Sequence, residues 1–358
     1  MKIGIVTQPL YANYGGILQN FALQQVLKKM GHTPVTLDYM PSLSFGRYLL
    51  YVGKSLICLL SPSRRHPIKP YKHFLERPAA IDAFVRNNID TTETISKYSK
   101  KILRKYGIEA LIVGSDQVWR LAYNADALED MYLAFAKGYP CRKIAYGASF
   151  GVEKWNYPKK TTETVRNLVK QFEAISVREN SGVNLCRENL GIEAQIVLDP
   201  TLLLEAFDYD SFCADPTPQE EPYLAAYVLD MNDEKAAFIK SVAESKNLKI
   251  KEMTVSDKGE SVENWLKAIR NADYIITDSY HGSLFSIIFE KQFSTFVNQE
   301  RGADRFITLF DRIGLTDRLI FNPSQSTRND GSIDYPPLRV PLQSLRNESV
   351  CFLNSALS

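Results

Sequence analysis

Short apolar runs alternate with helix-like segments along most of this 358-residue chain, and that alternation is what most restricts its fold. Residues 2–7 are such a run, residues 17–30 follow with helical periodicity, and residues 33–39 predict a second strand. Strands that alternate with helices pair in parallel, because each helix carries the chain back to the same end of the sheet. The sequence therefore predicts an α/β fold of doubly wound, Rossmann-like units.

Residues 208–222 are rich in Asp, Pro, Glu and Gln, and they interrupt the alternation before it resumes. We expect an N-terminal α/β domain over residues 1–205 that binds the acceptor, and a C-terminal α/β domain over 206–325 that binds the donor. Residues 326–358 predict a tail whose helix packs back on a domain. Two such domains facing a cleft form the GT-B-like layout, although a fold alone does not determine function.

The bulk composition excludes several classes of protein. The net charge of +2 gives no field that would attract nucleic acid. The five cysteines are scattered, with no CxxC pair and no histidine at ligand spacing, so we expect neither a disulfide framework nor a metal site. The N-terminus enters a strand pattern directly and lacks the features of a signal peptide. These features indicate a cytoplasmic protein.

Residues 46–62 form an unusually apolar segment, and a basic cluster containing Arg64, Arg65 and Lys69 follows it. The segment is too short and too polar to span a bilayer, which needs about 20 apolar residues. An apolar helix with a basic flank can lie on an anionic membrane surface, here the inner face of the membrane. The alternative is a helix packed on the sheet, followed by a solvated basic loop.

A strand, a polar turn and a helix follow one another within residues 273–289. The turn contains Ser279, His281 and Gly282, and the apolar helix is predicted to start at Ser283. A helix N-terminus offers unpaired N–H groups and partial positive charge, so this turn predicts an anion site. In open α/β sheets ligands bind beyond the carboxyl ends of the strands, where this turn would lie.

Two further strand ends carry candidate residues in the first half. A loop with Asn13, Tyr14, Gly15 and Gly16 follows the first strand, either for close approach of a ligand to the backbone or only for a tight turn. Ser115, Asp116 and Gln117 follow the strand at 109–113. Asp116 can accept a proton from a sugar hydroxyl or bond to it, or it caps the next helix.

Three arginines also follow predicted strands. Arg178 can hold a phosphate or carboxylate with two hydrogen bonds, or it forms a salt bridge with Glu173 or Glu179. Arg301 and Arg305 lie beyond the strand at 292–297 and are either anion ligands or charges on a helix face.

Several segments resemble the polysaccharide pyruvyl transferase family, and their order agrees with that family over roughly residues 1–315. They are residues 13–16 with 18–20, 114–119, 146–151, 176–179, 199–201 and 277–282. The resemblance implies a GT-B-like fold and transfer of a unit from phosphoenolpyruvate to a sugar of a surface polysaccharide or its lipid-linked precursor, as a pyruvate ketal. The sequence also resembles the branch of the family found in bacterial capsule loci.

The resemblance also implies residue roles. Arg178 and His281 match family positions associated with the donor, whereas Ser279 stands where better studied members carry an arginine. We expect Arg301 or Arg305 to supply the missing charge. His281 would be the general acid or phosphate ligand, and Asp116 would activate the acceptor. Phosphoenolpyruvate is then a co-substrate, and the reaction needs no cofactor.

Two other functions stay open at this stage. A nucleotide-sugar glycosyltransferase of the same fold would bind a nucleotide diphosphate in its second domain. A non-catalytic glycan-binding protein of a polysaccharide assembly system would bind sugar without turnover.

Overall fold

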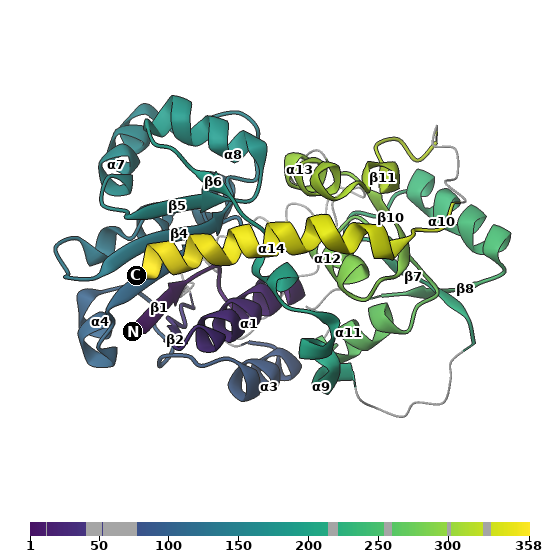
Figure 1. Ribbon diagram of the computed structural model, residues 1–358, viewed down its shortest axis with the longest axis horizontal. Helices are drawn as coiled ribbons and strands as arrows, with labels where there is room; N and C mark the ends of the chain where they lie inside the picture. The colour runs from purple at the N-terminus through teal and green to yellow at the C-terminus, as the bar shows by residue number, and fades with distance from the viewer. Residues whose placement is uncertain are drawn as a thin grey trace.

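The computed structural model describes residues 1–11, 13–40, 52, 77–213, 221–253, 260–298, 302–324 and 331–358. Within these residues the chain forms two β-sheets, each with helices packed against it (Figure 1). The strand orders are β2-β1-β3-β4-β5-β6 and β11-β10-β9-β7-β8, and every strand pair is parallel. The predicted fold class, two parallel-sheet α/β domains, is confirmed.

The first sheet and its helices use the N-terminal half of the chain. Its strands are β1 (Lys2–Val6), β2 (Thr33–Thr36), β3 (Ala110–Gly114), β4 (Arg142–Ala148), β5 (Ala174–Val177) and β6 (Gln195–Ile196). Its helices are α1 (Tyr14–Lys29), α3 (Ala79–Asn88), α4 (Lys100–Tyr106), α5 (Leu121–Asn124), α6 (Leu128–Met131), α7 (Lys159–Val169) and α8 (Asn180–Leu185).

The second sheet follows after short helical turns and α9 (Asp210–Cys213). Its strands are β7 (Tyr223–Tyr227), β8 (Lys249–Glu252), β9 (Tyr274–Thr277), β10 (Gln292–Phe296) and β11 (Leu319–Ile320). Its helices are α10 (Asp233–Lys246), α11 (Val262–Arg270), α12 (Tyr280–Ile288) and α13 (Asp304–Ile313). The predicted domain limits at residues 205 and 325 stay predictions.

An apolar core joins the two domains. The ring of Tyr209 lies 6.2 Å from Phe21 of α1 and 5.0 Å from Phe285 of α12, measured between ring centroids. Tyr14, the first residue of α1, stacks on Trp265 of α11 at 5.5 Å. All five side chains are buried. Because such packing excludes water, the first turn of α1 is held against the second domain.

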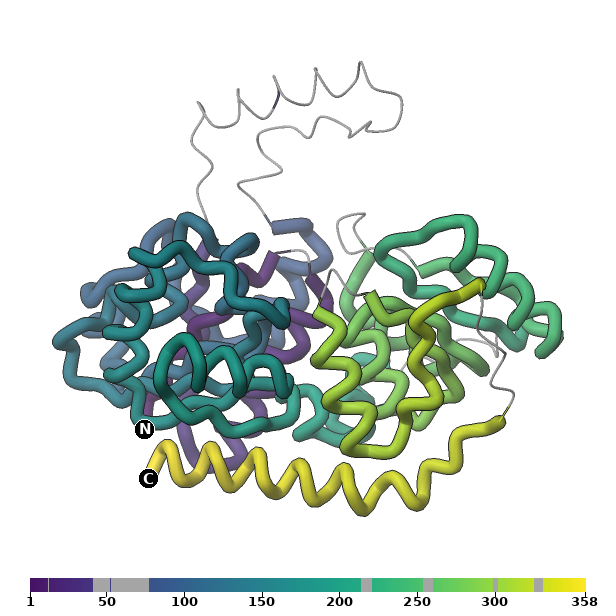
Figure 2. Tube along the Cα trace, turned by 90° about the horizontal axis from the view of Figure 1, so that it is seen from above, coloured from purple at the N-terminus to yellow at the C-terminus, as the bar shows by residue number. Residues whose placement is uncertain are grey.

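The last helix, α14 (Tyr335–Leu357), runs along both domains, as Figures 1 and 2 show. Near its start Arg339 pairs with Glu290 of the second domain at 2.8 Å. Near its end Phe352 packs against Tyr146 of β4 with ring centroids 6.1 Å apart. The helix therefore links the outer surfaces of the two domains.

Two helices begin earlier than predicted. Gly15 and Gly16, predicted as loop, lie in the first turn of α1, and α12 begins at Tyr280 rather than at Ser283. The predicted polar turn is shorter because the Ser279 hydroxyl caps α12 by accepting a hydrogen bond from the Gly282 N–H at 3.3 Å.

Some predictions fall outside the described residues. They include the predicted membrane-surface helix at 46–62, its basic cluster, and Arg301. No helix within the described ranges combines the length and apolar character that a bilayer crossing requires.

Candidate active site

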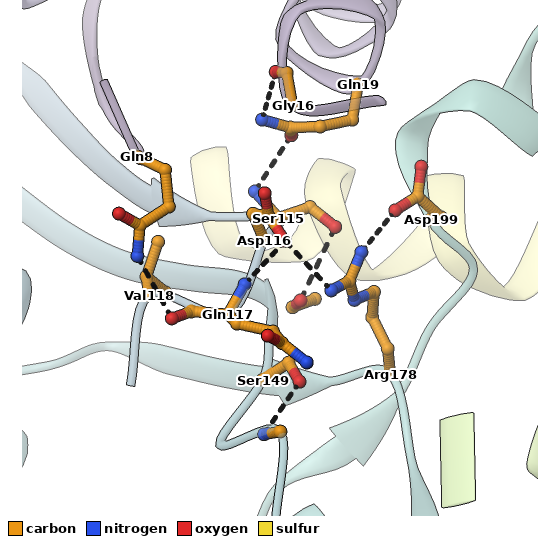
Figure 3. Close-up of polar contacts among 12 residues, drawn as sticks. Gln8, Gly16, Gln19, Ser115, Asp116, Gln117, Val118, Ser149, Arg178 and Asp199 are labelled. Carbon is orange, nitrogen blue, oxygen red and sulfur yellow. Dashed lines mark hydrogen bonds and ion pairs between the residues drawn. The ribbon is translucent and has the colours of Figure 1, made fainter. Parts of the chain in front are cut away.

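Arg178 lies at the centre of a buried charge cluster between the two domains. It follows β5, and its side chain is fully buried. Its Nη1 donates to Asp199 Oδ2 at 2.5 Å, and its Nη2 lies 3.5 Å from Asp116 Oδ1 (Figure 3). Parallel strands place their carboxyl ends at one edge, so residues that follow β3, β5 and β6 meet there. Both terminal nitrogens of Arg178 therefore face carboxylates.

Asp199 is the anion that the cluster shares. Its Oδ1 accepts from the backbone N–H of Thr201 at 3.1 Å and from the Thr201 hydroxyl at 2.8 Å. Burial raises the pKa of Asp199, but His281 and Arg178 outweigh burial and hold that pKa well below its usual range. Asp199 is thus ionised at neutral pH.

His281 reaches the cluster from the second domain. It is the second residue of α12, it is 6% exposed, and its Nε2 lies 3.5 Å from Asp199 Oδ2. This distance is at the outer limit of a hydrogen bond, and Nε2 has no closer partner among the described residues. A buried polar atom of this kind calls for a ligand, an ion or a water.

The first turn of α1 forms the opposite wall of the site. A methyl group at Gly15 would overlap the His281 ring, and one at Gly16 would lie 3.4 Å from Asp116 Oδ2. The N-cap residue Asn13 makes no capping bond and instead donates to Asp116 Oδ2 at 3.3 Å. Consecutive glycines thus let His281 and Asp116 approach one helix N-terminus, where partial positive charge collects.

Ser115 and Gln117, predicted on the acceptor side, hold the loop after β3. The backbone N–H of Ser115 donates to the side chain of Gln19 at 3.0 Å, and its hydroxyl donates to the Gly147 carbonyl at 3.4 Å (Figure 3). The carbonyl of Gln117 accepts from the Gln8 side chain at 3.0 Å. These bonds fix the direction in which Asp116 points. Tyr14 faces the domain interface, where its hydroxyl donates to the Glu260 carbonyl at 3.0 Å.

Ser279, Gly282 and Ser283, predicted to bind the donor, shape the start of α12. The Ser283 hydroxyl donates to the Ser279 carbonyl at 3.1 Å and lies 2.9 Å from the Thr295 hydroxyl of β10. A methyl group at Gly282 would come within 2.5 Å of the Thr277 hydroxyl. The described contacts of Ser279, Gly282 and Ser283 therefore hold the start of α12 against the second sheet.

Arg305, the remaining predicted cation, lies at the second position of α13. Its guanidinium is 4.9 Å from the ring centroid of Tyr280, and the guanidinium of Arg178 is 5.3 Å from the same ring. Tyr280 and Asp199 were not among the predicted site residues. The signal for Asp199 was its place in residues 199–201, one of the segments that carry the family resemblance. Tyr280, lying between Ser279 and His281, reads as an ordinary core aromatic.

Comparisons with known proteins indicate the family to which this chain belongs. A family model described as polysaccharide pyruvyl transferase matches residues 13–300. No curated protein sequence matches the chain.

Similar solved structures share little sequence with this chain. A Methanocaldococcus jannaschii UDP-GlcNAc 2-epimerase, in complex with UDP-GlcNAc and UDP, is 12% identical with a TM-score of 0.47; the alignment covers 97% of this chain and 100% of that one. An α-glucosyltransferase in complex with UDP is 10% identical, with a TM-score of 0.45 and coverage of 99% and 95%. A spinosyn rhamnosyltransferase complexed with thymidine diphosphate is 10% identical, with a TM-score of 0.40 and coverage of 100% and 94%.

The family model spans most of the chain and contains Asn13, Asp116, Arg178, Asp199 and His281. This chain belongs to the polysaccharide pyruvyl transferase family.

Proposed function

We propose that this protein transfers pyruvate from phosphoenolpyruvate to two hydroxyl groups of a sugar, forming a cyclic ketal. The observation that carries the proposal is the place of His281. Its ring lies at the N-terminus of α12 and against the N-terminus of α1, and its Nε2 faces Asp199 at 3.5 Å without a closer polar contact among the described residues. Two helix N-termini and an imidazole form a suitable site for a small anion that needs a proton.

The reaction balances without any other reactant. A proton adds to the methylene carbon of phosphoenolpyruvate, and one sugar hydroxyl bonds to C2 as its own proton leaves. The C2–O bond to phosphate breaks, and a second hydroxyl closes the ketal and loses its proton. One of the two hydroxyl protons replaces the proton added to carbon, and the other leaves with phosphate.

His281 and Asp116 take complementary parts in this proposal. His281 donates the proton or binds the departing phosphate, because imidazole exchanges protons near neutral pH. Asp116 accepts a proton from the attacking hydroxyl, and Asn13 and the Gln117 backbone N–H orient its carboxylate. Asp199 orients the imidazole. Arg178 adds charge to the site at a distance, because both of its terminal nitrogens face carboxylates.

A thermal-shift titration tests the donor. Phosphoenolpyruvate is compared with uridine and thymidine diphosphates on the wild type, His281→Ala and the control His32→Ala, whose histidine lies near the N-terminus. A ligand that binds only the folded state raises Tm with its concentration. We expect a shift with phosphoenolpyruvate that His32→Ala keeps and His281→Ala loses or reduces. A shift with the nucleotides alone would instead support a nucleotide-sugar glycosyltransferase.

The acceptor in this proposal is a saccharide, either free or linked to a lipid. A lipid-linked acceptor would bring the protein to the inner face of the membrane, where the basic cluster near residues 64–69 would meet anionic lipid. Co-sedimentation with anionic liposomes tests this part. Binding that is unchanged after Arg64, Arg65 and Lys69 are neutralised would contradict it.

A further inference from the structure

Arg305 lies at the boundary between the domains, next to the proposed donor site. Its neighbour Asp304 accepts a hydrogen bond from the backbone N–H of Ser181 in the first domain, at 2.6 Å. This contact anchors the start of α13 to the first domain. The Arg305 guanidinium then lies over the ring of Tyr280, the residue that directly precedes His281.

The two arginines that share the Tyr280 ring differ in their partners. Arg178 faces Asp199 and Asp116. Arg305 forms no ion pair and no hydrogen bond with any residue that the structure describes, and its buried Nε has no partner there. Its charge is uncompensated at contact distance.

Placing Arg305 beside Arg178 carries an electrostatic cost. Burial and then the like charge of Arg178 lower the pKa of Arg305 to about 10. The carboxylates of Asp116 and Glu179 oppose this shift without reversing it. Arg305 is half-buried and Arg178 is fully buried, and two cations placed so close together are stabilised when an anion binds between or beside them.

We propose that Arg305 binds the anionic donor directly, and that Arg178 instead positions Asp116 and Asp199. The identity of the donor as phosphoenolpyruvate rests on the proposed function. Arginine matches both its carboxylate and its phosphate, because a planar guanidinium donates two parallel hydrogen bonds to either group. Ser279 adds no charge to the site and caps α12.

Glu179 offers a competing, purely structural role for Arg305. Both residues line a cavity of about 10 Å³, close to the room that one water needs. Glu179 Oε1 accepts from the Phe150 N–H at 3.2 Å, whereas Oε2 has no partner among the described residues. One water in this cavity would join Glu179 to Arg305 across the domain boundary. The experiment must separate this role from donor binding.

Equilibrium binding of phosphoenolpyruvate and of inorganic phosphate, each measured by calorimetry at two salt concentrations, makes the separation. The variants are Arg305→Ala, Arg305→Lys, Glu179→Gln and the control Arg312→Ala, which lies on the same helix and pairs at the surface with Glu348. Loss of a hydrogen bond to a charged group weakens binding roughly 10- to 100-fold. We expect that loss in Arg305→Ala, partial recovery in Arg305→Lys, and a smaller salt dependence of Kd in Arg305→Ala.

Glu179→Gln and Arg312→Ala should bind phosphoenolpyruvate as well as the wild type does. A Glu179→Gln variant as impaired as Arg305→Ala would overturn the proposal in favour of the water-bridged pair. Arg305→Ala with unchanged affinity would overturn it too and leave the proposed function standing. If the wild type binds phosphate but not phosphoenolpyruvate, and Arg305→Ala loses phosphate, the anion site stands and the proposed function fails. A wild type that binds neither anion overturns both.

Discussion

The imidazole of His281 lies directly against Gly15, so that a methyl group at position 15 would overlap the ring. One residue belongs to α12 of the second domain and the other to α1 of the first. The contact brings the two helix N-termini together at one point. Each domain thus contributes one wall of the proposed donor site.

Gly15→Ala should displace His281 and reduce activity. General acid–base groups typically contribute about 10²- to 10⁴-fold to a rate, so we expect a loss of kcat/KM in that range. Gly16→Ala is the matched control in the same helical turn, because its methyl group would meet only the Asn13 amide at 3.1 Å and Asp116 at 3.4 Å. It should lose less activity.

The same contact predicts non-additivity. In a His281→Ala background the ring is gone and only the Cβ of residue 281 stays close to the added methyl group, at 2.7 Å, so Gly15→Ala should cost less further activity or stability than it does in the wild type. Alanine is also the better helix former, by about 1 kcal/mol. Fully additive losses in the double variant would show that Gly15 acts independently of His281.

Asp199→Ala should destabilise the fold strongly. It leaves Arg178 buried with one distant carboxylate, and removal of one partner from a buried pair costs about 3–5 kcal/mol. The exposed pair of Arg312 and Glu348 provides the comparison, and Glu348→Ala should cost no more than about 1 kcal/mol. Urea unfolding of both variants measures the difference, and equal costs would contradict the role given to Asp199.

Ser279→Ala removes the cap of α12. Loss of an N-cap side chain costs about 1 kcal/mol, so the midpoint of urea unfolding should fall modestly. Ser279→Asp keeps an acceptor at the cap and should unfold near the wild-type midpoint. The cap is refuted if Ser279→Ala and the wild type unfold at the same urea concentration.

Glu179 should make stability depend on pH. Burial raises its pKa, and the charge of Arg178 opposes that shift only in part. The folded protein therefore keeps this proton at a higher pH than the unfolded chain, whose glutamate titrates at about 4.3. The stabilising contribution is complete below that value and is lost as pH rises through the raised pKa of the folded state.

Glu179→Gln cannot titrate and supplies the control. The unfolding free energy of the wild type minus that of Glu179→Gln should fall as pH rises from about 4.3 towards neutral and above. Urea unfolding at a series of pH values measures this difference. A difference that is constant or rises with pH would contradict the assignment.

The sequence predicted the parallel sheets and the strand ends because both depend on local patterns. Asp116, Arg178 and His281 each follow a buried strand, and the parallel arrangement brings them to the ends of two sheets. The start of α1 was missed because the glycines at 15 and 16 are poor helix formers. The reason for glycine at these positions is the close approach of His281 and Asp116, which come from distant parts of the chain.

The pairing within the site could not be read from the sequence either. Arg178 was predicted to hold the donor, with a salt bridge to Glu173 or Glu179 as the alternative, whereas its described ion pairs are with Asp116 and Asp199. Arg142 is the described partner of Glu173. Local spacing favours neighbours along the chain, but burial selects the carboxylates that the sheet brings within reach.

The most direct test of the account follows the carbon skeleton of the donor. Phosphoenolpyruvate labelled at its methylene carbon is incubated with the protein and a panel of lipid-linked and free saccharides, and phosphate release and label in the saccharide are both measured. The account predicts one phosphate released for each labelled pyruvate bound as an acid-labile ketal, with both signals lost in His281→Ala. The account would be contradicted if no label entered any saccharide while the protein transferred a sugar from a nucleotide diphosphate sugar supplied in place of phosphoenolpyruvate.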